Sequence, residues 1–274
     1  MLEKAPGLGA DEVVLDLEDS VPVELKAQAR HAVAEALSVG DWKAGSVSVR
    51  VNGTSTPFYE DDVRAIAGAQ RLDSVVLPKA EGAAEIERTA ALLDDAAAGV
   101  ARVRPVAIQA LIESALGLRD VNEIAAASDR LDALILGPAD MSVSLGFPSP
   151  DEGDRWDFVR GAVLVAARAA GIEAIDGPFL QVTDADGLLA SAERAREFGF
   201  DGKWAIHPDQ IDPLNQVFSP SPEEVAQARA IATALEGDSE RGALRLDGEM
   251  IDEASRKRAE LVLARASAAG LSAD

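Results

Sequence analysis

Residues 105–114 read PVAIQALIES, a near-continuous apolar run that turns polar at Glu113. A run of this length and composition indicates a strand that is buried on both faces, as in a parallel sheet. Other runs along the chain share this pattern. They are EVVLDLED (12–19), SVSVRVNG (46–53), SVVLPKAE (74–81), LDALILGPAD (131–140), EAIDGPF (173–179) and GKWAIHP (202–208). We therefore expect seven parallel strands.

The segments between these runs are rich in Ala and carry apolar residues at three- and four-residue spacing, as in GAAEIERTAALLDDAAAGV. That spacing predicts helices. Alternation of strand and helix predicts an α/β fold, and seven strands fit a (β/α)8 TIM barrel better than a doubly wound sheet. The first strand is then missing, and the helical-looking opening MLEKAPGLG lies where the helix after it belongs. We expect the chain to begin inside the first βα unit, and the reading frame to extend upstream of Met1.

The pattern changes after GKWAIHP. The segment PSPEEVAQARAIATALEG predicts a helix with Ser221 as its N-cap, followed by a polar linker, DSERGALRLDG, and a last helix, DEASRKRAELVLARASAA. We therefore divide the chain into a barrel over residues 1–218 and a C-terminal helical extension over residues 219–274. The extension is expected to act as a lid and an oligomerisation arm.

Composition excludes several classes of function. The 274 residues include 26 Lys and Arg against 48 Asp and Glu, and the net charge of −22 opposes binding to nucleic acid or to an anionic membrane surface. The absence of cysteine and the presence of only two histidines leave a hard cation held by carboxylates as the expected metal. No apolar run approaches the roughly 20 residues of a membrane helix, and no signal peptide pattern is present. We expect a cytoplasmic protein.

Polar side chains end each predicted strand, and in a barrel the carboxyl ends of the strands surround the active site. These side chains are Asp16, Glu18, Asp19, Arg50, Asn52, Lys79, Glu81, Glu113, Asp140, Asp176, Lys203 and His207. Glu113 and Asp140 end successive strands, so both can reach one ion, and two carboxylates with waters are the usual ligands of Mg²⁺. Arg50 would lie across the rim, where it could stabilise an enolate or carboxylate oxygen. Metal and Arg together suggest enolate chemistry.

Purely structural interpretations compete with these. Asp19 could cap the next helix. Lys79 could be a solvated lysine paired with Glu81, and His207 could be a packed, hydrogen-bonded histidine rather than a base, with His31 as surface or core filler. Glu113 differs, because burying a carboxylate after an apolar run costs several kcal/mol unless a cation or donors compensate.

Taken together, the runs VVLDLEDSVPVELKAQAR, VRVNG, VVLPKAE, ALIESALGL, ILGPADMSVSLG, AIDGPF, GKWAIHP and RGALRLDGEMID resemble the HpcH/HpaI aldolase and citrate lyase beta-subunit family. The motifs AIDGPF, GKWAIHP and DGEMID are most similar to malyl-CoA and β-methylmalyl-CoA lyases. The resemblance extends over almost the whole chain. Members of the family begin with an LFVPG-like strand and basic residues that help to hold coenzyme A, and this piece is absent here.

The resemblance implies roles for residues of the rim. Glu113 and Asp140 would bind Mg²⁺, with Mn²⁺ as an alternative, and Glu18 and Asp19 would lie beside the metal's waters. Arg50 would hold the thioester or enolate oxygen. Lys79 would help to bind substrate. Because Pro138 has no N–H, binding of the substrate carboxylate would fall to the amides of Ala139, Asp140 and Met141.

The resemblance also implies a reaction and an assembly. We expect a Mg²⁺-dependent lyase that cleaves or forms a 3-hydroxyacyl-CoA such as malyl-CoA, giving acetyl-CoA or propionyl-CoA and glyoxylate. Asp252 would be the acid/base of a lid that enters the site of a neighbouring subunit in a homotrimer or homohexamer. Alternatives are a lyase for citryl or citramalyl thioesters, a malyl-CoA thioesterase, a 2-oxo acid aldolase without coenzyme A, and an inactive barrel that serves as a subunit or scaffold.

Overall fold

The protein is described by a computed structural model that covers all residues except 1, 40, 151–152, 237–242, 247 and 272–274. The chain divides into two compact units, Met1–Leu214 and Asn215–Asp274. The helix α9 (Ile211–Phe218) crosses this division. The sequence predicts a domain boundary between residues 218 and 219, and this boundary stays a prediction.

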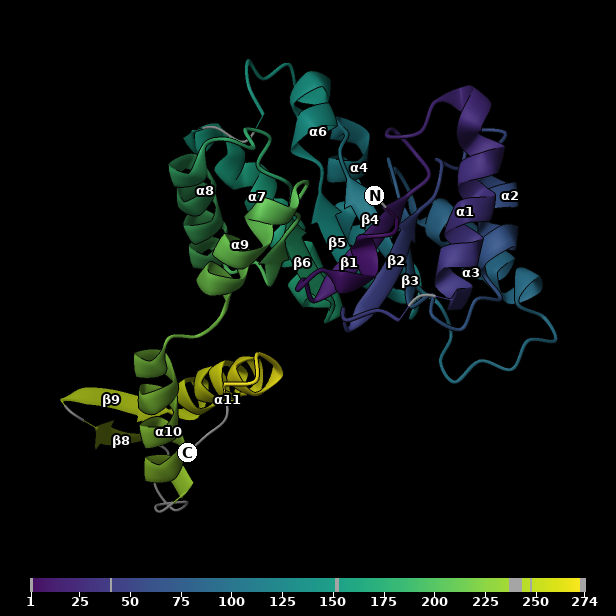
Figure 1. Ribbon diagram of the computed structural model, residues 1–274. Helices are drawn as coiled ribbons and strands as arrows, with labels where there is room; N and C mark the ends of the chain where they lie inside the picture. Colours follow the sequence, from purple (N-terminus) through teal and green to yellow (C-terminus); the bar gives the residue numbers. More distant parts are fainter. Residues whose placement is uncertain (1, 40, 151–152, 237–242, 247, 272–274) are drawn as a thin grey trace. The chain divides into compact units, whose positions relative to one another are not determined.

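The first unit contains one parallel sheet, in which the strands follow one another in chain order from β1 to β7. Figure 1 labels β1 to β6. The strands are β1 (Glu12–Asp16), β2 (Ser46–Arg50), β3 (Ser74–Leu77), β4 (Ala107–Ile112), β5 (Leu131–Leu136), β6 (Glu173–Asp176) and β7 (Gly202–Lys203). Each lies within one of the runs that predicted it, so the seven expected strands are confirmed. Asp16 pairs in register with Arg50, and this pairing aligns the carboxyl ends of β1 and β2.

The sheet is curled, and side chains from distant strands meet on its inner face. Glu12 on β1 accepts a hydrogen bond of 3.0 Å from Nε2 of Gln109 on β4. In a flat sheet these strands would lie about 14 Å apart, at about 4.8 Å per strand. One layer above them, Val76, Leu111 and Ile135 form a buried cluster. The observed fold is thus a curled half-barrel, consistent with the TIM barrel that the sequence predicts.

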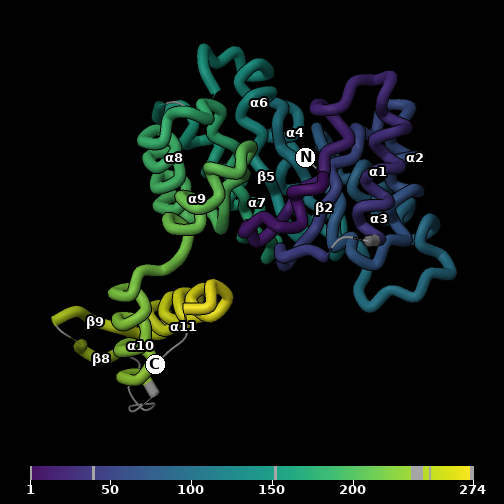
Figure 2. The backbone as a smooth tube through the Cα atoms, in the orientation of Figure 1, coloured from purple at the N-terminus to yellow at the C-terminus, as the bar shows by residue number. Residues whose placement is uncertain are grey.

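Helices cover the outer face of the curled sheet, with α1, α2 and α3 beside the first strands and α7 and α8 beside the later ones (Figure 2). Both faces of the strands are therefore covered, and all four residues of β3 are buried. No helix in the described part of the chain has the length and apolar character needed to span a membrane. The α-helices of this unit besides α9 are α1 (Lys26–Val39), α2 (Tyr59–Ile66), α3 (Ala83–Ala96), α4 (Ala115–Arg119), α5 (Val121–Ala125), α6 (Pro138–Leu145), α7 (Asp157–Ala170) and α8 (Ala185–Phe198).

Besides the end of α9, the described part of the second unit contains the helices α10 (Pro222–Glu236) and α11 (Glu253–Ala268) and an antiparallel hairpin of β8 (Ala243–Leu246) and β9 (Glu249–Asp252). Ser221 caps α10 as predicted, since its Oγ accepts from the N–H of Glu224. Part of the segment predicted as a polar linker is a strand, since its residues 243–246 form β8. The linker's residues 238–242 and the first residue of DGEMID, 247, lie outside the described residues.

Asp132 on β5 carries an unfavourable charge at the amino-terminal side of the sheet. The residue is exposed, yet partial desolvation by the surrounding protein and the charges of Glu12 and Glu173 raise the pKa of Asp132 to about 7. The ordinary pKa of Asp is about 3.9, so between about pH 4 and 7 the folded protein holds a proton that the unfolded chain has released. The free energy of unfolding should therefore fall as pH rises through this window.

We predict that Asp132→Asn raises the melting temperature by a few degrees at pH 8 and has no such effect at about pH 3, where Asp132 is protonated in both the folded and the unfolded chain. Thermal denaturation across this pH range measures the difference. Asp129→Asn, which removes the same charge at an exposed position, is the control. If both variants raised the melting temperature equally at pH 8, the cause would be the change in net charge and not the surroundings of Asp132.

Candidate active site

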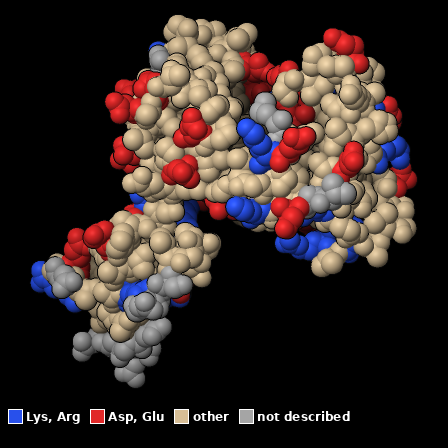
Figure 3. Space-filling view, viewed as in Figure 1, with Lys and Arg blue, Asp and Glu red and all other residues tan. Residues whose placement is uncertain are grey.

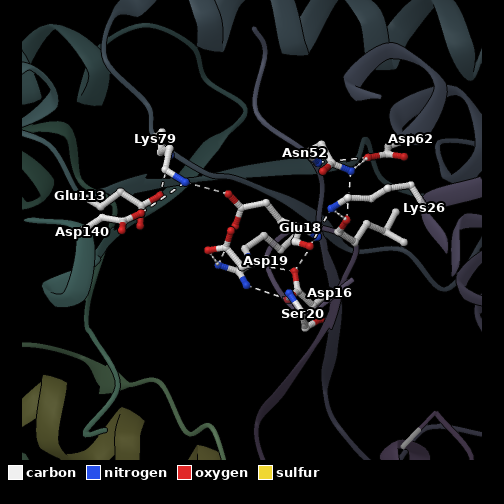
Figure 4. A network of polar contacts seen from close by, with 12 residues as sticks. Asp16, Glu18, Asp19, Ser20, Lys26, Asn52, Asp62, Lys79, Glu113 and Asp140 are labelled. Carbon is white, nitrogen blue, oxygen red and sulfur yellow. Dashed lines mark hydrogen bonds and ion pairs between the residues drawn. The ribbon is translucent and has the colours of Figure 1, made fainter. Parts of the chain in front are cut away.

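Five of the predicted rim residues lie together at the carboxyl ends of the strands, and Figure 4 labels Glu18, Lys79, Glu113 and Asp140 among them. Glu18 follows β1, Arg50 ends β2, Lys79 follows β3, Glu113 follows β4, and Asp140 lies in the first turn of α6 after β5. Short connections after each strand place all five side chains at one edge of the sheet. The sequence therefore predicted this grouping correctly.

The carboxylate of Glu18 lies between two cations. Its Oε1 is 3.0 Å from Nζ of Lys79 and its Oε2 is 2.9 Å from Nη1 of Arg50. Arg50 also binds Asp16 through two parallel hydrogen bonds of 2.8 and 2.7 Å. Burial tends to raise the pKa of Asp16, but the bonds from Arg50 outweigh this and the pKa is lowered. Asp16 and Glu18 therefore fix the guanidinium of Arg50 in one orientation.

Glu113 is a buried carboxylate whose charge no neighbouring side chain fully balances. Its Oε1 accepts a 2.8 Å hydrogen bond from the backbone N–H of Lys79. Burial raises the pKa of Glu113 to about 7, helped by the negative charge of Asp140 and opposed by Lys79. Gly137 makes room for this carboxylate, since a Cβ there would lie only 2.5 Å from Cβ and 2.7 Å from Oε2 of Glu113.

A cleft of about 370 Å³ opens between these side chains. Its lining consists of Asp19, Lys79, Glu81, Glu113, Ser114, Asp140, Val143 and Ser144. In the space-filling view, acidic side chains gather in a hollow of the larger unit (Figure 3). Among the lining side chains are four carboxylates, those of Asp19, Glu81, Glu113 and Asp140, and one cation, Lys79, so the cleft has an excess of negative charge.

The donor set suits a hard divalent cation. Within the described residues, no group of three or more acidic, histidine or cysteine side chains is arranged as a metal centre. Glu113 and Asp140 can supply two carboxylates, and Mg²⁺ commonly takes its other ligands from water or substrate. The excess of negative charge and the buried Glu113 fit such an ion.

A second layer of polar residues supports the rim, and of these the sequence indicated Asn52 but neither Lys26 nor Asp62. Lys26 is buried, and its Nζ donates bonds of 2.7 Å to the carbonyls of Leu17 and Glu18. Asn52 donates to the carbonyl of Leu17 and to buried Asp62. Nothing in the sequence indicated these contacts, because Lys26 and Asp62 occupy helices that read as ordinary amphipathic segments.

Several detailed expectations need correction. Asp19 does not cap the next helical segment, Val23–Leu25, whose N-cap is Pro22 without a side-chain hydrogen bond, and Asp16 instead accepts the hydrogen bonds from the N–H groups of Glu18 and Ser20. The side chain of Asp19 is instead exposed, 4.0 Å from Arg50, and lines the cleft. Lys79 pairs with Glu18 and Asp140 rather than with Glu81.

The α6 amides are not all available to a substrate carboxylate. The N–H of Met141 donates to the carbonyl of Gly137, so it cannot bind substrate as predicted. Ala139 and Asp140 lie in the first turn of α6, where amides lack an intrahelical acceptor. The α6 N-terminus thus offers two of the three expected donors.

The two histidines and the residues that end β6 and β7 do not line the cleft. His207 is half-exposed and its Nδ1 accepts from the N–H of Asp209, so it is hydrogen-bonded but not packed. His31 is exposed. Asp176 and Lys203 pair with each other in a buried ion cluster that Arg160 joins at 3.6 Å.

Asp252 belongs to the second unit, where it is the N-cap of α11. Its Oδ1 accepts a 3.1 Å hydrogen bond from the N–H of Ser255. The bonds from Ser255 lower the pKa of Asp252 from its ordinary value. The capping role, which competes with a role in catalysis, is therefore present in the structure.

Comparison with known proteins gives extensive matches. A family model described as HpcH/HpaI aldolase/citrate lyase matches residues 1–208. An L-malyl-CoA/beta-methylmalyl-CoA lyase of Cereibacter sphaeroides is 39% identical over 287 residues, covering 97% of this chain and 90% of that protein. A citrate lyase subunit beta of Leuconostoc mesenteroides subsp. cremoris is 36% identical, with coverage of 98% and 89%.

Among solved structures, the protein CitE from Mycobacterium tuberculosis in complex with magnesium, acetoacetate and coenzyme A matches with a TM-score of 0.74 and 34% identity. This match covers 93% of this chain and 89% of that chain. The likeness in sequence and in structure therefore extends over nearly the full length of both proteins.

The closeness of Gly137 to Glu113 generates a stability prediction. Gly137→Ala should lower the free energy of unfolding by about 1–3 kcal/mol, because the added Cβ must displace the Glu113 side chain in a packed site. Gly161→Ala, in α7, is the control, since a Cβ there meets nothing within 4 Å and should stabilise the helix by about 0.5–1 kcal/mol. Urea denaturation of both variants measures these changes in the free energy of unfolding. Equal stability of Gly137→Ala and the unsubstituted protein would contradict the tight packing.

Proposed function

Because the chain belongs to the HpcH/HpaI aldolase/citrate lyase family, we propose that it is a Mg²⁺-dependent carbon–carbon lyase acting on a 3-hydroxyacyl-CoA such as malyl-CoA. The products would be acetyl-CoA or propionyl-CoA and glyoxylate. The observation that carries the proposal is the cleft at the strand ends. Asp140 and the buried Glu113 both line this cleft, and its excess of negative charge suits a divalent cation. The relatives support it, since one is named for malyl-CoA cleavage and another binds magnesium and coenzyme A.

Glu113 and Asp140 would hold the metal, with Glu18 and Asp19 beside its waters. When bound, Mg²⁺ would supply Lewis acidity toward the oxygens of the oxo acid. The free amides of Ala139 and Asp140 would bind the substrate carboxylate at the N-terminus of α6.

The chemical step requires the loss of one proton and the return of another. A base removes the proton of the 3-hydroxyl group, the C2–C3 bond breaks, and its electron pair forms the thioester enolate while C3 becomes the aldehyde of glyoxylate. Arg50 stabilises the charge on the enolate oxygen, and its pairs with Asp16 and Glu18 hold it in place before the reaction begins. Protonation at C2 by an acid then releases acetyl-CoA.

The proposal assigns this acid to Asp252. The C-terminal unit would act as a lid, and the resemblance of DGEMID to the family suggests that Asp252 serves a neighbouring subunit in a homotrimer or homohexamer. Lys79 remains a candidate for substrate binding under this proposal. The alternatives are citryl or citramalyl thioester cleavage, hydrolysis of malyl-CoA, and an inactive scaffold.

We predict that Glu113→Gln and Asp140→Asn each abolish Mg²⁺ binding and nearly all cleavage of malyl-CoA, while the fold persists because a costly charge is removed. Titration calorimetry measures the metal affinity. Assays with malyl-CoA, citramalyl-CoA and citryl-CoA identify the substrate, and release of free malate identifies a thioesterase.

Glu123→Gln, at an exposed position on α5, is the matched control and should leave both properties unchanged. Unchanged Mg²⁺ affinity in Glu113→Gln and Asp140→Asn would place the ion elsewhere. A protein that neither binds Mg²⁺ nor turns over any of the three thioesters would fit the scaffold instead.

Mixed oligomers test Asp252. Asp252→Ser keeps a capping hydroxyl on α11 but lacks a carboxylate, so it should be stable and inactive. When it is unfolded and refolded together with inactive Glu113→Ala, about a quarter of the activity should return if the lid serves a neighbouring subunit and subunits mix at random. Glu113→Ala refolded alone is the control. An active Asp252→Ser protein would show that Asp252 only caps the helix.

A further inference from the structure

Lys79 has an unusual backbone conformation. Its φ of 49° makes it the one non-glycine residue with positive φ in the described part of the chain. This conformation costs an L-residue about 1–2 kcal/mol, so contacts around it must hold it in place. It is separated from the end of β3 by Pro78, and it lines the cleft.

The conformation allows one residue to contact both proposed metal ligands. The backbone N–H of Lys79 donates to Oε1 of Glu113 at 2.8 Å. Its Nζ lies 3.3 Å from Oδ2 of Asp140 and 3.0 Å from Oε1 of Glu18. Figure 4 shows the ammonium pointing toward Glu18, with the Glu113 and Asp140 side chains on its other side.

The ammonium therefore supplies positive charge where a divalent cation is expected. The side chains of Lys79 and Asp140 are 48% and 45% exposed, so both have room to move. A divalent ion bound by Asp140 would lie a few ångströms from the ammonium, where like charges repel and both compete for one carboxylate. Glu18 offers Lys79 a second partner that the ion does not require.

We propose that Lys79 is an internal counter-cation that holds Asp140 in the absence of a divalent ion and gives it up, retaining Glu18, when the ion binds. The inference rests on the metal site of the proposed function. It assigns to Lys79 a positioning role toward the metal in addition to any contact with substrate. The backbone bond to Glu113 does not depend on the side chain, so that ligand stays fixed throughout.

The inference predicts that removing the ammonium strengthens metal binding. Lys79→Met should bind Mg²⁺ about tenfold more tightly than the unsubstituted protein, because one competing positive charge near a divalent ion is gone. Lys79→Gly should show the same gain and also tolerates the positive φ, so it remains informative if the methionine variant folds poorly. Lys79→Arg keeps the charge and should not show this gain.

Titration calorimetry with MgCl₂, without substrate, measures these affinities. The control is Lys43→Met, which makes the same change in net charge at an exposed position and should leave the affinity unchanged. Thermal denaturation gives a second readout, since tighter binding implies a larger Mg²⁺-induced rise in melting temperature for Lys79→Met at the same metal concentration.

The outcomes separate this inference from the proposed function. Equal or weaker Mg²⁺ binding by Lys79→Met and Lys79→Gly, with clear binding by the unsubstituted protein, would overturn the counter-cation role and leave the metal site intact. If Lys43→Met gained as much Mg²⁺ affinity as Lys79→Met, the change in net charge would explain the gain. That result would also overturn the counter-cation role. Failure of every protein to bind Mg²⁺ would overturn the metal site itself.

Discussion

The ion pairs of Glu18 with Arg50 and Lys79 connect the ends of the first three strands, and the rest of the site depends on them. Lys79 extends the connection to Glu113 after β4 and to Asp140 after β5. Carboxylates at neighbouring strand ends would otherwise repel one another in a partly buried cleft, where charges interact more strongly than in water. The two cations therefore hold a carboxylate-rich rim together without neutralising it.

This rim is also supported from below. Lys26 and Asn52 bind the carbonyl of Leu17, and Lys26 also binds the carbonyl of Glu18. Buried Asp62 orients Asn52 and is itself paired with Arg30. A buried charge is tolerated when it is paired and hydrogen-bonded, and removing one partner leaves an uncompensated buried charge that destabilises the fold. The loop that carries Glu18 is therefore rigid, which suits a site whose charges must be in place before reaction.

Sequence reasoning succeeded where burial leaves a simple pattern. Strands covered on both faces read as continuous apolar runs, so β1 to β7 were found, and a carboxylate after such a run made Glu113 conspicuous. It failed where the partner is distant in sequence. Nothing near Lys26 shows that its ammonium reaches the loop after β1. The hairpin of β8 and β9 was missed because its strands are short, mostly exposed and lack a continuous apolar run.

Charge also bears on the order of binding under the proposed function. A 2-oxo acid such as glyoxylate is an anion, and the cleft presents four carboxylates to it, with Lys79 in the lining and Arg50 beside Glu18 as the neighbouring cations. Both cations are already paired, so little attraction remains for an incoming carboxylate. A divalent ion at Glu113 and Asp140 would remove much of this excess and, under the role proposed for Lys79, would draw Asp140 away from the ammonium. Metal binding should therefore precede oxo acid binding in the synthetic direction, because the ion creates the positive potential that the anion requires.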